Sequence, residues 1–330
     1  MPKVTITIAI VAYQSGAYLQ ACVDALARQT MGDFEVVVAD NASTDGSIEA
    51  LRLPDDRFRV EPMGANLGFA AANNRVAFAA DAEWFAVINP DAQADKDWLA
   101  ALMIAAARWP NAASFGCTQL SLDDPTRLDG VGDVWHAAGV AWRARNGWSA
   151  QDIPPEGEVF GPCGAAALYR RDLFVGLGGF DERYFCYCED VDLAYRLRLA
   201  GWTSVQCPGA VVLHAGSGIS GRVSEFTLFH GHRNLIWTFA KNTPAAWLWF
   251  LIPWRIAYGL ALIWAARKVG GDRFVARGQW EALKGLRPIL ASRRDVQRTR
   301  RASLSQLAGA MAWSPFSPKR RDIVRVKSPT

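Results

Sequence analysis

Apolar and polar positions in the first 120 residues or so follow two alternating patterns. Short apolar runs such as Val4–Ala12 and Trp84–Ile88 have the length and composition of buried strands. Between them, segments such as Ala17–Arg28 carry apolar residues at helical spacing. Strands that alternate with helices of about 10–15 residues are typical of a mostly parallel sheet with helices on both faces. We expect further strands and helices over Phe34–Ala39, Phe58–Val60, Leu67–Ala80 and Asp97–Arg108.

The following 120 residues are less regular. Residues 120–160 are rich in Gly, Asp, Pro and Trp, which predicts loops or short strands that could line an acceptor. Beyond them the apolar pattern returns, and the sequence again predicts an α/β arrangement. We expect strands over Gly161–Arg170, Thr203–Cys207 and Val211–His214, and helices over Glu189–Ala200 and Phe226–Lys241.

The C-terminal third begins with the 22-residue apolar stretch Ala245–Ala266, whose one charged residue is Arg255. Its length suffices for a bilayer span, but Pro253 and Arg255 near its middle make insertion costly. Its four tryptophans suit a helix that lies in the membrane interface. We therefore expect interfacial attachment, while a true span and a buried helix over the catalytic domain stay open.

Charge is distributed unevenly along the chain. From Arg267 to the end there are 16 Lys and Arg against 4 Asp and Glu, whereas the residues before Arg267 hold 20 against 28. A basic segment next to an apolar helix predicts attraction to an anionic membrane surface. We find no nucleic-acid-binding module and expect no nucleic-acid partner. Residues 241–300 are therefore expected to form a hydrophobic and basic helical extension, and residues 301–330 a disordered basic tail.

Composition narrows the class of protein. A chain of 330 residues with 51% hydrophobic and 21% charged residues can bury a sizeable core, which excludes disorder for most of its length. The six cysteines form no C-x-x-C pair, which disfavours a zinc site or a disulfide framework and fits a reducing compartment.

Candidate polar residues follow the predicted strands at their carboxyl ends, where ligands bind in open α/β sheets. Asp40 begins the turn-rich segment D-N-A-S-T-D-G, which turn and capping chemistry alone could explain. Asp91 follows Asn89 and Pro90 at the end of another strand, and its carboxylate could hold Mg²⁺ or Mn²⁺. His214 also ends a strand, and a neutral imidazole can bind Mn²⁺.

Acidic residues cluster at the start of one predicted helix. Glu189, Asp190 and Asp192 share its first turn, where one acidic residue would already satisfy the helix dipole. A carboxylate at this position could take a proton from an attacking hydroxyl group.

The order of these motifs resembles that of the family 2 glycosyltransferases, over about residues 4–240. The resemblance implies a GT-A fold, with a nucleotide-sugar half over residues 1–120 and an acceptor and catalytic half over 121–240. Two of the segments look most like the rhamnosyltransferase branch of the family. The matching segments are V-A-Y-Q-S, V-V-V-A-D-N-A-S-T-D-G-S, N-L-G-F-A-A-A-N-N, I-N-P-D, G-A-A-A-L-Y-R-R, G-G-F-D-E, C-E-D-V-D-L-A-Y-R and H-A-G-S.

The resemblance also implies roles for the nucleotide-sugar half. Asp40 would bind the pyrimidine base, in a pocket lined by Ala12 and Tyr13. Asp91 matches the last acidic position of the family's D-x-D metal motif, and Asn89 stands where many members have the first aspartate. Metal binding would therefore depend on His214 as well, and we place Asn66 in the nucleotide-sugar site.

In the second half, Asp190 matches the catalytic base of the family's E-D pair, with Glu189 as its neighbour. Arg233 matches the position of an arginine that could hold a phosphate, and Asp181 is a further candidate for the acceptor. The implied reaction is a single inverting displacement, assisted by Mg²⁺ or Mn²⁺.

The donor expected from the resemblance is dTDP-L-rhamnose, with UDP-galactofuranose, UDP-glucose and UDP-galactose as alternatives. The expected acceptor is a lipid-linked saccharide or polysaccharide of the cell envelope, used at the cytoplasmic face of the inner or plasma membrane.

A catalytically inactive glycan-assembly protein is a further alternative, although it would be expected to lack Asp91 or Asp190. A dinucleotide-dependent oxidoreductase would need G-x-G-x-x-G after the first strand, where this chain has A-Y-Q-S-G. A nucleotidyltransferase would need a glycine-rich basic loop there, which is also missing.

Overall fold

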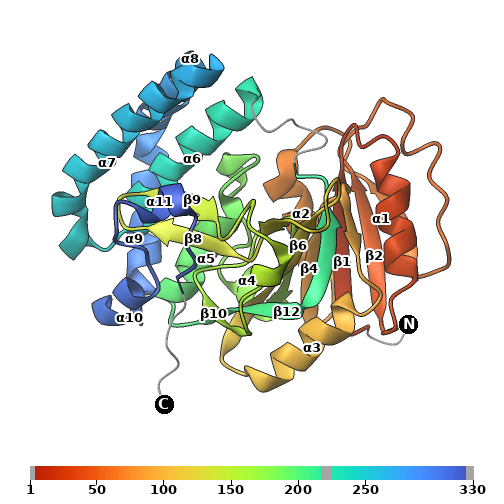
Figure 1. Ribbon diagram of the computed structural model, residues 1–330. Helices are drawn as coiled ribbons and strands as arrows, with labels where there is room; N and C mark the ends of the chain where they lie inside the picture. The colour runs from red at the N-terminus through yellow and green to blue at the C-terminus, as the bar shows by residue number, and fades with distance from the viewer. Residues whose placement is uncertain (1–3, 217–223, 325–330) are drawn as a thin grey trace.

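The computed structural model describes residues 4–216 and 224–324. Within them, a ten-stranded sheet has the main order β10-β12-β6-β11-β4-β1-β2-β3, with β5 paired to β12 and β7 to β6, and β8 and β9 form a separate hairpin (Figure 1). The strands are β1 (Ile6–Ala12), β2 (Phe34–Asp40), β3 (Phe58–Pro62), β4 (Trp84–Ile88), β5 (Ala92–Ala94), β6 (Ala112–Ser121), β7 (Leu128–Gly130), β8 (Asp133–His136), β9 (Val140–Arg143), β10 (Gly157–Val159), β11 (Ala166–Arg170) and β12 (Thr203–His214).

Strand direction divides the sheet into two parallel blocks. β4, β1, β2 and β3 run parallel to one another, and β6 runs parallel to β12. β11 lies between the blocks and is antiparallel to both β4 and β6. Every residue of β1 is buried, as expected for a strand covered on both faces. The predicted α/β sheet of mostly parallel strands is confirmed.

Helices cover both faces of the sheet. One apolar cluster joins the sheet to α1 and α3, and a second joins its other face to α2, α4 and α5. These helices, with two short 3-10 segments, are α1 (Tyr18–Ala27), α2 (Gly68–Ala79), α3 (Trp98–Arg108), η1 (Ala150–Asp152), α4 (Arg171–Gly176), η2 (Glu182–Tyr184) and α5 (Glu189–Leu199).

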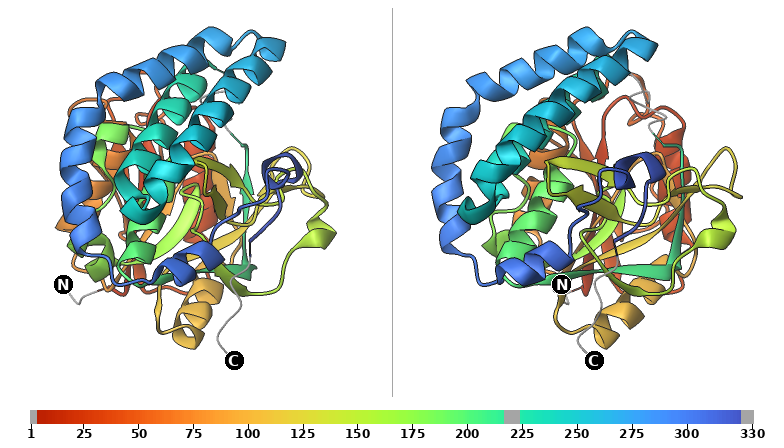
Figure 2. Two further views of the ribbon diagram at one scale, coloured as in Figure 1. Left: turned by 90° about the vertical axis from the view of Figure 1, so that its left-hand side faces the viewer. Right: turned by 60° about the vertical axis from the view of Figure 1, so that its left-hand side comes forward.

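The C-terminal helices gather at the end of the sheet that lies away from α1 (Figures 1 and 2). α6 packs against α8, α9 and α5, so the predicted extension packs directly against the part of the chain that precedes it. The helices here are α6 (Glu225–Asn242), α7 (Ala245–Ala266), η3 (Arg267–Val269), α8 (Asp272–Lys284), α9 (Leu286–Arg298), α10 (Leu304–Gly309) and α11 (Ser317–Arg320).

The expectation of a disordered tail over 301–330 is wrong for residues 301–324. Leu307, Ala310 and Met311 are buried in an apolar cluster with Trp135. The backbone N–H of Ala312 donates to the carbonyl of Trp135 at 2.9 Å. A few apolar residues among the basic ones therefore anchor this segment beside β8, and residues 325–330 lie outside the described part.

α7 presents two different faces. Leu251, Arg255 and Gly259 are buried at four-residue intervals and face the protein. Large apolar side chains on the rest of its surface are between 52% and 79% exposed, namely Trp249, Phe250, Trp254, Ile256, Leu260 and Trp264. Across the described residues, Ala245–Val269 is the one helical stretch long and apolar enough to cross a membrane, judged by length and composition. The alternative that α7 is a buried helix is therefore wrong for its outer face, which is exposed, and holds only for its inner face.

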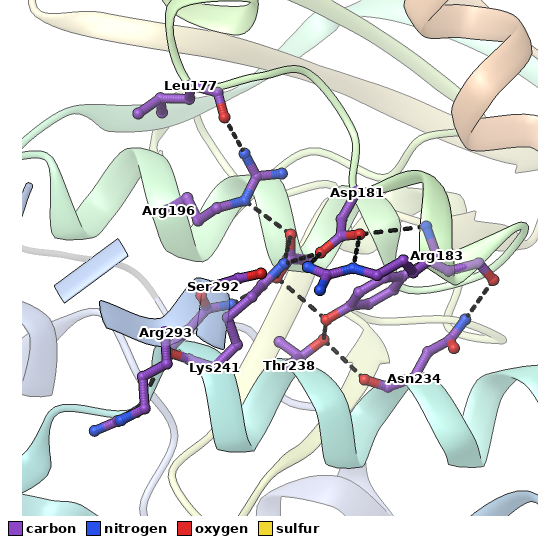
Figure 3. A network of polar contacts seen from close by, with 12 residues as sticks. Leu177, Asp181, Arg183, Arg196, Asn234, Thr238, Lys241, Ser292 and Arg293 are labelled. Carbon is purple, nitrogen blue, oxygen red and sulfur yellow. Dashed lines mark hydrogen bonds and ion pairs between the residues drawn. The ribbon is translucent and has the colours of Figure 1, made fainter. Parts of the chain in front are cut away.

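A buried ionic network joins α5 to α6 (Figure 3). Lys241 Nζ lies 2.6 Å from Asp181 Oδ2 and 2.9 Å from Asp192 Oδ2. Arg196 Nε donates to Asp192 at 2.8 Å, and Arg183 pairs with Asp181. Burial alone would raise the pKa of Asp192, but Lys241 and Arg196 hold it below its ordinary value. Both aspartates therefore stay ionised, and their cations fix α5 against α6.

Candidate functional site

Two adjoining cavities open near the carboxyl ends of the central strands. The first, which we call the strand-end cavity, has a volume of about 430 Å³. The second, the helix-start cavity, has a volume of about 320 Å³ and contains the beginning of α5. The two share a wall made of Phe69, Asn89, Arg143, Cys186 and Tyr187. A group bound in one cavity would therefore lie beside a group bound in the other.

The strand-end cavity is lined by most of the residues predicted for nucleotide-sugar binding, namely Tyr13, Asn66, Asn89 and Asp91, and by the predicted metal ligand His214. The neighbouring strand ends of β1 and β2 bring Ala12 and Asp40 together in register. Neither is among the cavity-lining residues, and Asp40 Oδ1 accepts a hydrogen bond from the backbone N–H of Ser43 at 2.9 Å. Asn41 lines the cavity instead, so binding of a base by Asp40 stays a prediction.

Pairing of β5 with the end of β12 brings Asp91 and His214 together. Ala92 is the register partner of His214, and His214 Nε2 lies 3.3 Å from Asp91 Oδ1. On the other side of the ring, Nδ1 lies 2.7 Å from Asp129 Oδ2. A carboxylate behind the ring orients an imidazole and increases its basicity, as in protein metal sites. The side chains thus offer one nitrogen and one carboxylate oxygen to a cation such as Mn²⁺.

Asp129 also forms an ion pair with Arg143, the last residue of β9. Burial lowers the pKa of His214, but Asp129 and Asp91 outweigh this and raise it above the ordinary value. Burial lowers the pKa of Arg143, but Cys163, Asp129 and Asp133 outweigh this and hold it above its ordinary range, so Arg143 remains charged. A charged guanidinium, paired with Asp129, therefore lies in the wall between the two cavities.

In the helix-start cavity, the structure separates the roles of the acidic residues. Asp190 accepts hydrogen bonds from the backbone N–H groups of Gly164 and Val191, both at 2.7 Å. Such donors stabilise a carboxylate anion. Burial raises the pKa of Glu189, Asp133 and Asp190. Of these three carboxyl groups, only Asp190 accepts several backbone hydrogen bonds that lower its pKa again in part. Asp190 is accordingly the residue of this group best able to act as a base.

Asp133, Cys163 and Asp190 also lie close enough together to be considered as metal ligands. Their chemistry fits a cation poorly. A cysteine sulfur suits softer cations than Mg²⁺ or Mn²⁺, burial raises the pKa of the Cys163 thiol, and Arg143 contributes a positive charge nearby. The site formed by Asp91 and His214 is therefore the better candidate for a metal.

The loop before α5 has an unusual backbone. Phe185, Tyr187 and Cys188 all have positive φ, between 64° and 70°, a conformation that non-glycine residues rarely adopt. The amide of Asn234 holds this loop, because Nδ2 lies 3.0, 2.9 and 2.7 Å from the carbonyl oxygens of Tyr184, Cys186 and Tyr187. Gly68 fits closely beneath it, since a Cβ there would lie 2.5 Å from the Phe185 ring.

Two predicted site residues have structural roles instead. Arg233 donates to the carbonyl oxygens of Arg183 and Tyr184, so its guanidinium supports the same loop. Asp181 belongs to the buried network around Lys241. Neither lines either cavity, and the expectation that they contact acceptor or phosphate is not supported by their positions.

Sequence reasoning missed Asp129, Asp133, Arg143 and Asn234 as functional candidates. The first three come from the irregular region around β7, β8 and β9, where neither periodicity nor a motif marks them. Asn234 directly follows Arg233, but nothing in the sequence reveals that it contacts three carbonyl groups some 50 residues away.

Comparison with known proteins decides the family. Residues 7–178 match the family described as Glycosyl transferase family 2. The chain belongs to this family. It is also 34% identical, over 79% of its length and 91% of the relative's, to an N-acetylglucosaminyl-diphospho-decaprenol L-rhamnosyltransferase of Mycobacterium tuberculosis. The protein is therefore a glycosyltransferase, and the resemblance to the rhamnosyltransferase branch is confirmed.

Solved structures confirm the GT-A type fold. A mannosyltransferase of Pyrobaculum calidifontis, in complex with GDP-Man and Mn²⁺, superposes with a TM-score of 0.55 at 20% identity, over 90% of this chain and 86% of that one. The GalNAc-T7 structure with UDP, GalNAc and Mn²⁺ gives a TM-score of 0.59 at 14% identity, over 73% of this chain and 48% of that one.

Proposed function

We propose that this glycosyltransferase transfers L-rhamnose from dTDP-L-rhamnose, with inversion, to a hydroxyl group of a lipid-linked saccharide of the cell envelope. The observation that carries the proposal is the position of Asp190 in a cavity that shares a wall with the strand-end cavity. The sugar and acceptor follow those named for the mycobacterial relative. A UDP-hexose or UDP-galactofuranose donor is the alternative within the same family.

In this proposal the donor occupies the strand-end cavity and the acceptor sugar the helix-start cavity. Asp190 takes the proton of the attacking hydroxyl, and its two backbone donors stabilise the carboxylate form against the effect of burial. Arg143, which lines both cavities, attracts the donor diphosphate and orients it. Because Asp91 and Asp190 are both present, a catalytically inactive protein is the less favoured alternative.

Asp91 and His214 would hold a divalent cation, Mg²⁺ or Mn²⁺, with Asp129 behind the imidazole. When bound, such a cation neutralises negative charge that develops on the departing diphosphate. Two observations support this metal site. Asp91 Oδ1 and His214 Nε2 lie 3.3 Å apart, and the two similar solved structures contain Mn²⁺.

We further propose that the outer face of α7 lies on the cytoplasmic face of the inner or plasma membrane. Its exposed tryptophans and leucine would enter the lipid interface, and basic residues after Arg267 would contact anionic headgroups. Buried Arg255 on the inner face of the same helix argues for attachment to the surface rather than a span.

The metal proposal predicts that Asp129→Asn weakens Mn²⁺-dependent binding of dTDP by about 10–100-fold, because the imidazole loses its carboxylate partner. Calorimetric titration of dTDP with Mn²⁺, and again with a chelator, measures the effect. Asp124→Asn, a change at an exposed aspartate of the same segment, is the control and should bind normally. Equal dTDP binding with metal and with chelator would exclude Asp91 and His214 as ligands of a metal that the donor requires.

The base assignment predicts that Asp190→Asn lowers kcat by about 10²-fold or more, since an amide cannot accept the proton. Glu189→Gln should retain most of the turnover, and both variants should bind donor. For the unmodified chain, activity should fall as pH decreases through the pKa of Asp190, which burial raises above its ordinary value of 3.8. Turnover at saturating donor, with melting temperature as a folding control, gives the comparison. If Glu189→Gln loses more activity than Asp190→Asn, the assignment is wrong.

The membrane proposal predicts that the full chain floats with phosphatidylglycerol vesicles. Combined replacement of Trp249, Trp254 and Leu260 by serine should reduce flotation by about tenfold or more, because their apolar surface no longer enters the lipid. A matched variant with serine at Phe78 and Ile104, exposed apolar residues on other helices, should float normally. Unchanged flotation of the α7 variant would show that another surface binds the vesicles.

A further inference from the structure

Arg255 is a buried cation that lacks a described partner. Its side chain extends from the inner face of α7, and the residue is only 6% exposed. Across the described residues, neither Nε nor Nη2 has a hydrogen-bond partner. Burial lowers the pKa of the guanidinium to about 10, so it is still charged at neutral pH. A buried charge without a counter-ion is unfavourable, and a binding site for an anionic ligand would account for it.

The immediate surroundings of Arg255 are shaped closely around it. The turn between β8 and β9 passes so near that a Cβ at Gly139 would lie 2.6 Å from Arg255 Cδ. His232 of α6 lies close enough to be affected by the charge of Arg255, and its Nδ1 is also buried without a described partner. Burial and the nearby positive charge of Arg255 lower the pKa of His232 to about 4. The imidazole is therefore neutral at pH 7 and can donate one hydrogen bond.

His232 connects Arg255 with the reaction site, because it lines the helix-start cavity together with Asp190. On the other side of Arg255, α7 carries the exposed apolar face assigned above to the membrane. The groups are thus arranged as an apolar surface, a buried cation, a polar cavity wall and a base. A lipid-linked saccharide has the same order of parts, namely a hydrocarbon chain, phosphate and then sugar.

We propose that Arg255 and His232 bind a phosphate group of the lipid-linked acceptor and so place its sugar beside Asp190. This inference rests on the proposed function, and it adds the residues that select an acceptor carrying phosphate. A guanidinium and an imidazole N–H can both donate to phosphate oxygens, and the guanidinium bonds would be charge-assisted. The headgroup of an anionic phospholipid has related chemistry and is the competing source of the phosphate.

The test uses the full chain and farnesyl diphosphate, a short prenyl diphosphate, as the probe. Farnesyl diphosphate should raise the melting temperature of the unmodified chain, and farnesol should not. Arg255→Met should weaken the apparent affinity for farnesyl diphosphate by about tenfold or more. Without ligand, this variant should melt no lower than the unmodified chain, because it loses an unpaired buried charge. Arg267→Met, a change at an exposed arginine just after α7, is the matched control.

Kinetics provide a second readout. Arg255→Met should raise the KM for a prenyl-diphosphate-linked saccharide about tenfold or more, with the donor KM unchanged. If Arg255→Met does not fold, His232→Gln should weaken the binding of farnesyl diphosphate in the same direction. Because binding of farnesyl diphosphate needs no sugar transfer, this measurement can succeed even if the proposed donor is wrong.

Three outcomes would overturn the inference. One is equal affinity of the unmodified chain and Arg255→Met for farnesyl diphosphate. Another is equal binding of farnesol and farnesyl diphosphate. The third is an Arg255-dependent stabilisation by phosphatidylglycerol vesicles but not by farnesyl diphosphate, which would assign the site to a phospholipid headgroup.

Discussion

The pairing of Lys241 with Asp181 and Asp192 links the two helices that border the proposed acceptor site. Asp192 lies in the first turn of α5, the turn that also carries Asp190, and Lys241 lies near the end of α6. Removing one partner from such a buried network leaves an unpaired charge, at a cost of about 3–5 kcal/mol. The position of Asp190, the proposed base, relative to α6 is therefore fixed by charge as well as by apolar packing.

The consequences extend along α6 to both cavities. Asn234, two turns before Lys241, holds the carbonyl groups of the loop that precedes α5. That loop contributes Cys186 and Tyr187 to the wall shared by the two cavities. Its positive φ angles are compatible with a stable loop because Asn234 satisfies the backbone around them. The C-terminal helices, which continue from α6, thus support the reaction site as well as providing the surface proposed to meet the membrane.

Local patterns in the sequence were sufficient for β1 to β4, for α1 to α3 and for several residues at element ends. Asp91, His214 and Asp190 could be found because each ends a strand or begins a helix, positions that an apolar pattern reveals. The central strand β6 was missed because polar and small residues interrupt its apolar pattern, and the predicted break in β12 at Pro208–Gly209 proved to be an irregularity within one strand. Arg143 and its partners could not be predicted, because strand pairing between segments distant in the sequence brings them to the site. The local pattern of apolar residues does not show which strands pair.

The central claim is that donor and acceptor meet at the shared wall of the two cavities, where Asp190 activates the hydroxyl for a single displacement. The anomeric configuration of the product tests this most directly, because a single displacement inverts the anomeric carbon. Nuclear magnetic resonance of the saccharide formed from dTDP-β-L-rhamnose should show an α-linked rhamnose. A β-linked product would show retention and would contradict a mechanism in which Asp190 acts as the base of a single displacement.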